Sequence, residues 1–411
     1  MNYVFISPNF PSRYYLFAEA LRRKGVNVLG IGDSVYADLE PRLLSSLTEY
    51  YFVKDLSDKE AMAKAVSYYQ SKYGKIDYIE SNNEWWLELD AYLREKFDVR
   101  SGFFPADMAH IKAKSAMKEY FQKGGAKTMR YIVVSGKEDL GKAKDFASLV
   151  GYPLFVKPNV GVGASDSYSL QSEAELEKFF SSPLPEPYIM EEFVDGTIIS
   201  FDGVCSSSGE VVFATSDHFP VPVADVVNEA IDDFYWTNPF ALPMDDIDAS
   251  SFLEVGKKVV KAFGIGKRCF HIEFFVLNKD KPGLARKGEF VALECNMRPP
   301  GGYTPDLIDF AESASIYDIY ADVICFDENR EDMGKEKYYA FTSARRDCYH
   351  YLHSEEEILA RYRYQLCMHG RYPTHLAPAM GDGYYYAKFK TKEEGTEFVS
   401  FVRAKASQEA K

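Results

Sequence analysis

The chain lacks a long apolar run, an excess of basic residues and a secretory leader pattern. No segment approaches the roughly 18 apolar residues of a membrane span, and the opening MNYVFISPNF has neither the basic nor the apolar region of a signal peptide. The formal net charge is −14, and no basic stripe indicates a nucleic-acid surface. We therefore expect a cytoplasmic protein that binds neither membranes nor nucleic acid.

Cysteine is scarce and carries no recognisable motif. The six cysteines show no C-x-x-C spacing, and neither G-x-S-x-G nor a paired Cys/His nucleophile motif is found. Reduced, mostly buried thiols are expected, as in a cytosolic protein. Catalysis by a side-chain nucleophile is not indicated.

Apolar residues are plentiful, at 46% of the 411 residues, with 27% charged and 15% aromatic. This composition is typical of a globular protein, and the length predicts two or three compact units. Short apolar runs alternate with amphipathic segments over the first hundred residues. Such alternation predicts a parallel sheet covered on both faces, in an α/β domain over 1–105. Only SPNFPSR follows the first strand, so a dinucleotide-binding G-x-G-x-x-G loop is missing.

The remaining chain mixes strands and helices. One helix is predicted over about 106–124, then a strand-rich unit, with SSSGE as a hairpin turn and a loop over about 219–248. DLIDFAESASIYDIYADVI reads as a single helix, and the charged stretch 327–337 as a boundary. The predicted fold class is α/β plus α+β, with domains at 1–105, 106–328 (small lobe about 125–195) and 329–411.

A carboxylate–amide pair stands out in FVALECNMRPPGG. Residues two apart on a strand share a face, so Glu294 and Asn296 should converge while Leu293 and Cys295 point the other way. Glu273 lies in the preceding apolar run and joins them if the two strands are neighbours. Oxygen ligands of this kind suit Mg²⁺, although acids on a solvated sheet face would give the same pattern.

Upstream, PLFVKPNVGVGAS places Lys157 at the end of a strand, before a glycine-rich loop. Glycines let a backbone approach phosphate closely, and lysine supplies a point charge. The loop is not a Walker A motif, because G-K-[ST] is missing. The next strand ends in EEFVDG, whose backbone can bind an adenine edge, with Phe193 and Val194 covering the ring.

These motifs, in this order, resemble the ATP-grasp superfamily of carboxylate–amine ligases over about residues 105–325. The first hundred residues resemble that family's N-terminal α/β domain, and the tail resembles the small C-terminal domain of biotin-carboxylase-like and purine-biosynthesis members. The resemblance implies two α+β lobes that clasp ATP.

The resemblance also implies roles for single residues. Lys114, with Lys112 as a rival, matches the first phosphate-contacting lysine and Lys157 the second. The loop over the phosphates would contain Gly161, Gly163, Ala164 and Ser165. The adenine contacts would come from Glu191, Glu192, Phe193 and Val194.

Glu273 and Glu294 would hold one or two Mg²⁺ ions, for which Mn²⁺ can substitute, with Asn296 completing the second site. Arg298 would meet the transferred phosphoryl group, so Arg298 and Lys157 are the expected catalytic residues. One position departs from the family pattern: Ile198 stands where many relatives carry a ribose-binding acid. Glu192 or Asp202 is then left to bind the ribose, or that contact is lost.

The activity implied is an ATP-dependent ligase that phosphorylates a carboxylate and joins the acyl phosphate to an amine or similar nucleophile. Its partners would be small-molecule acids and amines, and a homodimer is one expectation, since relatives form dimers. The alternatives are a bicarbonate-phosphorylating enzyme of the carboxylase or carbamoyl-phosphate type, and a nucleotide-binding relative without catalysis.

Overall fold

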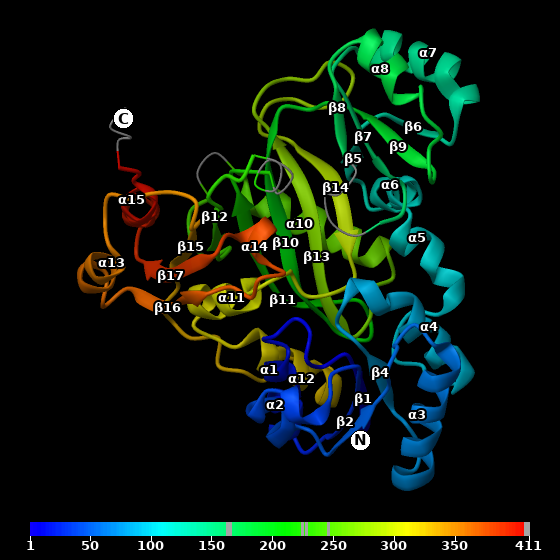
Figure 1. The fold of residues 1–411 in the computed structure, drawn as a ribbon, viewed down its shortest axis with the longest axis vertical. Coiled ribbons are helices and arrows are strands. Elements are labelled where there is room, and N and C mark those ends of the chain that lie inside the picture. Colours follow the sequence, from blue (N-terminus) through cyan, green and yellow to red (C-terminus); the bar gives the residue numbers. More distant parts are fainter. Residues whose placement is uncertain (162–166, 223–225, 227–228, 245–246, 407–411) are drawn as a thin grey trace.

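The computed structural model describes residues 1–161, 167–222, 226, 229–244 and 247–406. Three lobes surround a long central sheet (Figure 1). The N-terminal domain lies at one end of the molecule, a small lobe lies at the other, and the C-terminal segment projects to one side. Within the described ranges, no helix combines the length and apolarity needed to cross a membrane.

The N-terminal domain contains the predicted parallel sheet, in the order β3-β2-β1-β4. Apolar clusters cover both of its faces, which confirms the prediction from strand–helix alternation. Its strands are β1 (Asn2–Ile6), β2 (Asn27–Gly32), β3 (Glu49–Phe52) and β4 (Tyr78–Glu80). Its helices are α1 (Tyr15–Arg23), α2 (Pro41–Ser46), α3 (Lys59–Tyr73) and α4 (Leu87–Lys96), with short 3-10 turns η1 (Tyr36–Asp38) and η2 (Glu84–Trp86).

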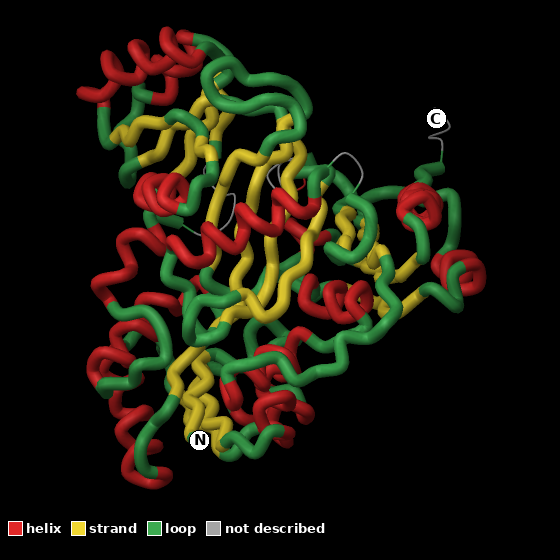
Figure 2. Tube along the Cα trace, turned by 180° about the vertical axis from the view of Figure 1, so that it is seen from behind, coloured by secondary structure: helices red, strands yellow, loops and turns green. Residues whose placement is uncertain are grey.

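The central sheet has the order β16-β17-β15-β12-β11-β10-β13-β14-β5. Helix α10 (Ala249–Ala262) lies across its back (Figure 2), where Phe252 and Val259 join the apolar cluster under the sheet. The hairpin between β10 and β11 turns at SSSGE as predicted. The strands are β5 (Lys127–Thr128), β10 (Gly196–Cys205), β11 (Val211–Phe219), β12 (Phe234–Asn238), β13 (Arg268–Leu277), β14 (Phe290–Asn296), β15 (Tyr339–Arg345), β16 (Leu366–Arg371) and β17 (Gly383–Phe389).

The small lobe is an antiparallel sheet in the order β6-β9-β7-β8, packed against two helices. Its strands are β6 (Tyr131–Val134), β7 (Leu154–Pro158), β8 (Tyr168–Leu170) and β9 (Tyr188–Glu192). The helices are α7 (Leu140–Val150), preceded by η4 (Lys137–Asp139), and α8 (Glu173–Phe179). The C-terminal helices are α13 (Glu355–Arg361), α14 (Ala377–Met380) and α15 (Lys392–Arg403). Strands β15 to β17 of the C-terminal segment pair onto β12 and so extend the central sheet.

Three sequence predictions of secondary structure were wrong. Strand β12 lies inside the stretch predicted as a loop, because FYWTN has strong strand propensity despite its Asp- and Pro-rich flanks. The helix predicted after RPPGGYTP is two helices, α11 (Thr304–Glu312) and α12 (Ile316–Phe326). They separate at Ser313, whose φ of +51° is left-handed, and Ser315 caps α12 by accepting a bond from the Asp318 amide.

The helix predicted over 106–124 is also interrupted. It consists of η3 (Pro105–Asp107), α5 (Met108–Lys112) and α6 (Lys114–Lys123), with Ala113 extended between the helices. Asn159 causes the restart, because its backbone and side-chain oxygens accept bonds from the amides of Lys114 and Ser115 at 2.8 and 3.0 Å. The break places Lys114 at the first position of α6.

Candidate nucleotide and metal site

Glu273 and Glu294 stand directly opposite each other on the neighbouring strands β13 and β14. The next pair along the same face is His271 opposite Asn296. The two carboxylate side chains are 25% and 19% exposed, so solvent reaches both. The predicted convergence of the acids on one face is therefore present.

Leu293 does not follow the predicted alternation. The register shifts between Glu273 and Phe274, which produces a β-bulge. The extra residue lets Leu293 pack with Met129 and Val194 on the same side of the sheet as the acids, whereas Cys295 lies in the cluster under the sheet. The prediction was correct for buried Cys295 and wrong for Leu293. All six cysteines are free thiols.

Lys114 reaches the acids from the start of α6. Its Nζ lies 3.1 Å from Glu294 Oε1 and donates a bond to the Gly161 carbonyl oxygen at 3.1 Å. The rival Lys112 points elsewhere and pairs with Glu88 at 3.3 Å. Of the predicted phosphate loop, Gly161 is described, while Gly163, Ala164 and Ser165 lie outside the described residues.

Lys157 is tied to Glu191 inside the small lobe. Its Nζ is 3.3 Å from Glu191 Oε2, and the Lys118 Nζ is 2.5 Å from Glu191 Oε1. Burial alone would raise the pKa of Glu191, but the two ammonium groups lower it to about 2. The Glu191 carboxylate therefore faces the two lysines. The sequence analysis did not identify Lys118. It lies four residues after Lys114 and therefore shares a helix face with it, which could have indicated its role.

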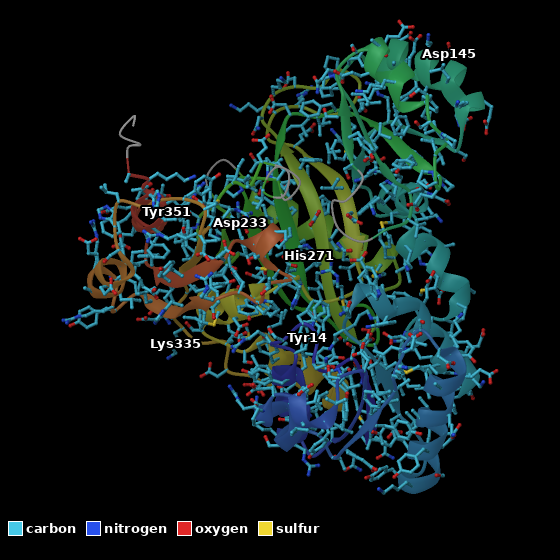
Figure 3. The ribbon with its side chains drawn as sticks, in the orientation of Figure 1. Tyr14, Asp145, Asp233, His271, Lys335 and Tyr351 are labelled. Carbon is cyan, nitrogen blue, oxygen red and sulfur yellow. The ribbon has the colours of Figure 1, made fainter. Side chains whose placement is uncertain are left out.

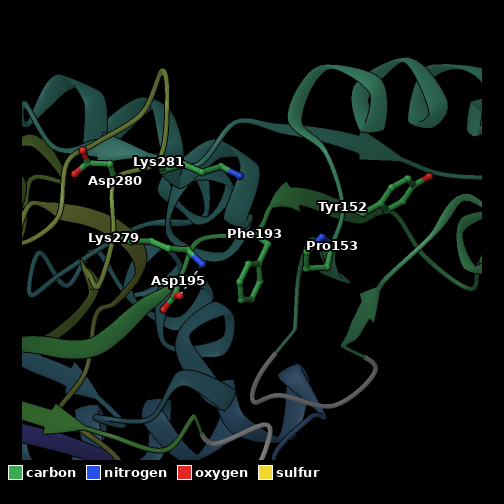
Figure 4. Close-up of a pocket in the computed structure, with 7 residues that line it drawn as sticks. All are labelled: Tyr152, Pro153, Phe193, Asp195, Lys279, Asp280 and Lys281. Atoms are coloured by element: carbon green, nitrogen blue, oxygen red, sulfur yellow. Dashed lines mark ion pairs between the residues drawn. The ribbon is translucent and has the colours of Figure 1, made fainter.

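A pocket of about 220 Å³ lies at the hinge between the small lobe and the central sheet (Figure 4). Pro153 and Phe193 line it. Phe155 of β7 pairs with Glu191 of β9, and Pro153 and Phe193 lie two residues from that pair, towards the same end of the sheet. By strand alternation, Pro153 and Phe155 share the face of Lys157, because Leu154 and Val156 lie in the lobe's core. Pro153 lies four residues before Lys157, which in a strand corresponds to about 13 Å between the pocket and Lys157. The remaining lining residues are Tyr152, Asp195, Lys279, Asp280 and Lys281.

The two acids considered for the ribose contact are engaged elsewhere. The buried Glu192 carboxylate accepts bonds from the Arg130 backbone amide and guanidinium. Asp202 is fully buried and pairs with His271. Ile198 lies opposite Phe275, on the same face as Glu273, so the surface at this point is apolar.

Arg298 meets an acid from the N-terminal domain. Its Nη2 and Nε donate to Glu84 Oε2 at 2.8 and 3.2 Å, and its Nη1 donates to the Pro299 carbonyl oxygen. Burial opposes the charge, but Glu84 raises the pKa of Arg298 above its usual value. Glu84 was not identified from the sequence, since its partner lies more than two hundred residues away.

His271 lies between two carboxylates near the centre of the molecule (Figure 3). Its Nδ1 is 2.6 Å from Asp202 and its Nε2 is 3.1 Å from Glu273. Burial alone would lower the pKa of His271, but the two acids raise it to about 10. The two acids therefore favour the protonated ring.

The residues present fit a hard divalent cation. Two facing carboxylates and an amide provide oxygen donors, and both acids are solvent-accessible. In the described part of the chain, no group of three or more His, Cys, Asp or Glu side chains is arranged to hold a metal. The predicted set does not need one, because its third member is Asn296.

Comparison with known proteins finds sequence relatives among L-amino acid ligases and carbamoyl phosphate synthases. No family model matches the sequence. The chain is 25% identical over 307 residues to an L-arginine-specific L-amino acid ligase of Bacillus subtilis, a match that spans 71% of this chain and 67% of that protein.

Solved structures match over nearly the whole chain. An L-amino acid ligase from Bacillus licheniformis superposes with a TM-score of 0.70 at 16% identity, covering 97% of this chain and 95% of that one. The biotin carboxylase domain of the Hydrogenobacter thermophilus 2-oxoglutarate carboxylase, in complex with MgADP and bicarbonate, has a TM-score of 0.70 at 13% identity, covering 98% and 90%. The chain has the fold of these solved structures and is similar in sequence to an L-amino acid ligase, and both findings agree with the resemblance to ATP-grasp ligases drawn from the motifs.

Proposed function

We propose that this protein is an ATP- and Mg²⁺-dependent ligase that activates a carboxylate as an acyl phosphate and joins it to an amine. One observation carries the proposal. Glu273 lies opposite Glu294, and Lys114 of α6, the lysine expected to contact phosphate, contacts Glu294. Lys157 lies in the small lobe; burial lowers its pKa, but Glu191 and, more weakly, Glu294 and Glu273 raise it above its usual value. Cations and metal-binding acids on two facing lobes suit a triphosphate with its metal.

The nucleotide would extend between the hinge pocket and the lysines. Phe155 and Phe193 would cover the base, with the backbone of residues 191–194 at its edge. Lys114 and Lys157 would contact the phosphates, together with the loop around Gly161. This arrangement follows from the side-chain alternation along β7, which keeps Phe155 and Lys157 on one face.

In the reaction, a substrate carboxylate oxygen attacks the γ-phosphorus, and the bond from that phosphorus to ADP breaks. Lys157 and Arg298 stabilise charge on the transferred group, because fixed donors suit developing oxyanions. The amine nitrogen then attacks the acyl carbon, phosphate departs, and the amine loses a proton. When bound by Glu273, Glu294 and Asn296, Mg²⁺ supplies charge neutralisation; we include in the proposal a second ion and replacement by Mn²⁺.

We propose amino acids as the substrate class, because both L-amino acid ligases that resemble this chain are named for such substrates. We also propose a cytoplasmic location and a homodimer.

An ADP-release screen of amino acids in pairs tests the proposed ligase activity. Release that requires both an acid and an amine supports the ligase. Tight ATP binding without ADP release over a broad panel would instead indicate a non-catalytic nucleotide-binding protein.

A second candidate is phosphorylation of bicarbonate, which the fold shared with a bicarbonate-bound biotin carboxylase domain favours. The test is ADP release with bicarbonate and no organic acid, in buffer freed of carbon dioxide before bicarbonate is added. Bicarbonate-dependent release that amino acids do not increase would favour this candidate over the ligase.

A further inference from the structure

A row of polar side chains crosses the central sheet and ends at the metal-binding acids. Cross-strand pairing aligns Thr237, Asp217, Ser200, Glu273 and Glu294 on five successive strands, β12, β11, β10, β13 and β14. One step along, Asp202 pairs with His271. Thr237, Asp217, Ser200 and Asp202 are fully buried. Buried polar groups are costly unless they are hydrogen-bonded, so this row needs a physical role that an apolar face could not provide.

The row is internally connected. Ser200 donates a hydrogen bond to Asp202 Oδ2, and Thr237 donates one to Asp217 Oδ1. Asp202 Oδ1 holds His271 Nδ1 at 2.6 Å, and His271 Nε2 holds Glu273 Oε1 at 3.1 Å. The Glu273 carboxylate is thus fixed from one side through a chain of three buried residues.

This connection leaves one oxygen of Glu273 for other contacts. His271 engages Oε1, whereas Oε2 accepts no hydrogen bond within the described part of the chain. A ring held at both nitrogens cannot rotate without breaking a contact, so the direction of the carboxylate is set before any ligand arrives. Partners of this kind orient metal ligands, and their loss typically lowers metal affinity or activity by about 10–100-fold.

We infer that His271, held by Asp202 and Ser200, is a positioning residue that orients the Glu273 carboxylate for the divalent cation. The inference rests on the proposed function, because it assumes that Glu273 binds the cation. The two ring nitrogens of His271 contact Asp202 and Glu273.

The experiment measures Mn²⁺ binding by electron paramagnetic resonance, with a non-hydrolysable ATP analogue present. His271→Phe keeps a planar ring and removes both nitrogens. We expect its Mn²⁺ dissociation constant to rise by about 10–100-fold. His218→Phe is the matched control, because His218 is equally buried, stacks on Trp236 at 4.9 Å and pairs with Ile199 on the other face of the sheet. Its dissociation constant should stay within about threefold of the wild type.

Asp202→Asn is a second variant, in case His271→Phe does not fold. It keeps an acceptor for His271 Nδ1 but removes the charge, so a smaller rise is expected. Wild-type Mn²⁺ affinity in a folded His271→Phe or Asp202→Asn protein would overturn the inference while leaving the ligase proposal intact. If the wild-type protein binds no Mn²⁺ with the analogue, the metal assignment itself fails, and the inference fails with it.

Discussion

Glu84 of the N-terminal domain accepts two hydrogen bonds from Arg298, which follows strand β14 of the central sheet. The guanidinium that we assign to the transferred phosphoryl group is thus held by a residue from a different domain. On that assignment, the N-terminal domain contributes a residue to the proposed site. Glu84→Gln should lower kcat by about tenfold, because a neutral partner orients the guanidinium less firmly, and should leave the KM for ATP unchanged.

Glu88→Gln is the control for this prediction, because Glu88 pairs with Lys112 at the surface. Steady-state kinetics with the best amino-acid pair from the screen provide both constants. A Glu84 variant with wild-type kcat would show that the contact between Glu84 and Arg298 has no part in turnover.

Glu294→Gln should abolish ATP turnover while preserving the fold. The change removes the charge that faces Glu273 and contacts Lys114, yet keeps the size of the side chain. We expect at least a hundredfold loss in ADP release, with a melting temperature within a few degrees of the wild type. Glu254→Gln, on the exposed face of α10 beside Lys258, serves as the control. Normal turnover in the Glu294 variant would refute the metal assignment.

Lys114 and Lys112 form a natural matched pair. Lys114→Met removes the ammonium beside Glu294 and Gly161, whereas Lys112→Met removes one that pairs with Glu88. Hydrogen bonds to charged groups contribute about 1.5–3 kcal/mol, so the KM for ATP should rise about 10–150-fold in the first variant. The second should behave as the wild type. Equal effects in the two variants would contradict the assignment of Lys114.

The loss of folding stability at acid pH should depend on Glu191. Its pKa falls from 4.5 to about 2 on folding, so the carboxylate stabilises the fold above pH 4.5, and that stabilisation is lost as the pH falls from 4.5 towards 2. The contribution is of the order of 3 kcal/mol. Glu191→Gln should be less stable at pH 7 and show a flatter loss of stability over that range. Urea unfolding at a series of pH values measures both, and parallel curves would argue against the pairing of Glu191 with Lys118 and Lys157.

The sequence predicted the parts of the site that depend on local periodicity. Glu273, Glu294 and Asn296 follow from strand alternation in two apolar runs, and the structure places those runs side by side. The β-bulge at Leu293 could not be predicted, because it depends on the register against β13. Strand β12 could have been recognised from FYWTN, since its aromatic and β-branched residues outweigh the turn-forming flanks.

Contacts between distant segments were beyond sequence reasoning. The pairing of Glu84 with Arg298 depends on how the N-terminal domain docks, and no pattern around Glu84 indicates it. The restart of α6 depends on Asn159, which follows a strand of the small lobe. Alternation along β13 puts His271 on the face of Glu273, but Asp202, which contacts its other nitrogen, comes from β10 and could not be assigned to it from the sequence.

The most direct test of the account follows an oxygen atom. An amino acid whose carboxylate carries a heavy oxygen isotope is incubated with the protein, MgATP and the amine partner, and the released phosphate is analysed by mass spectrometry. Attack of the carboxylate on the γ-phosphorus predicts one labelled oxygen in each phosphate formed. Unlabelled phosphate, with ADP and product formed at the same rate, would contradict an acyl phosphate and the arrangement of cations and acids built around it.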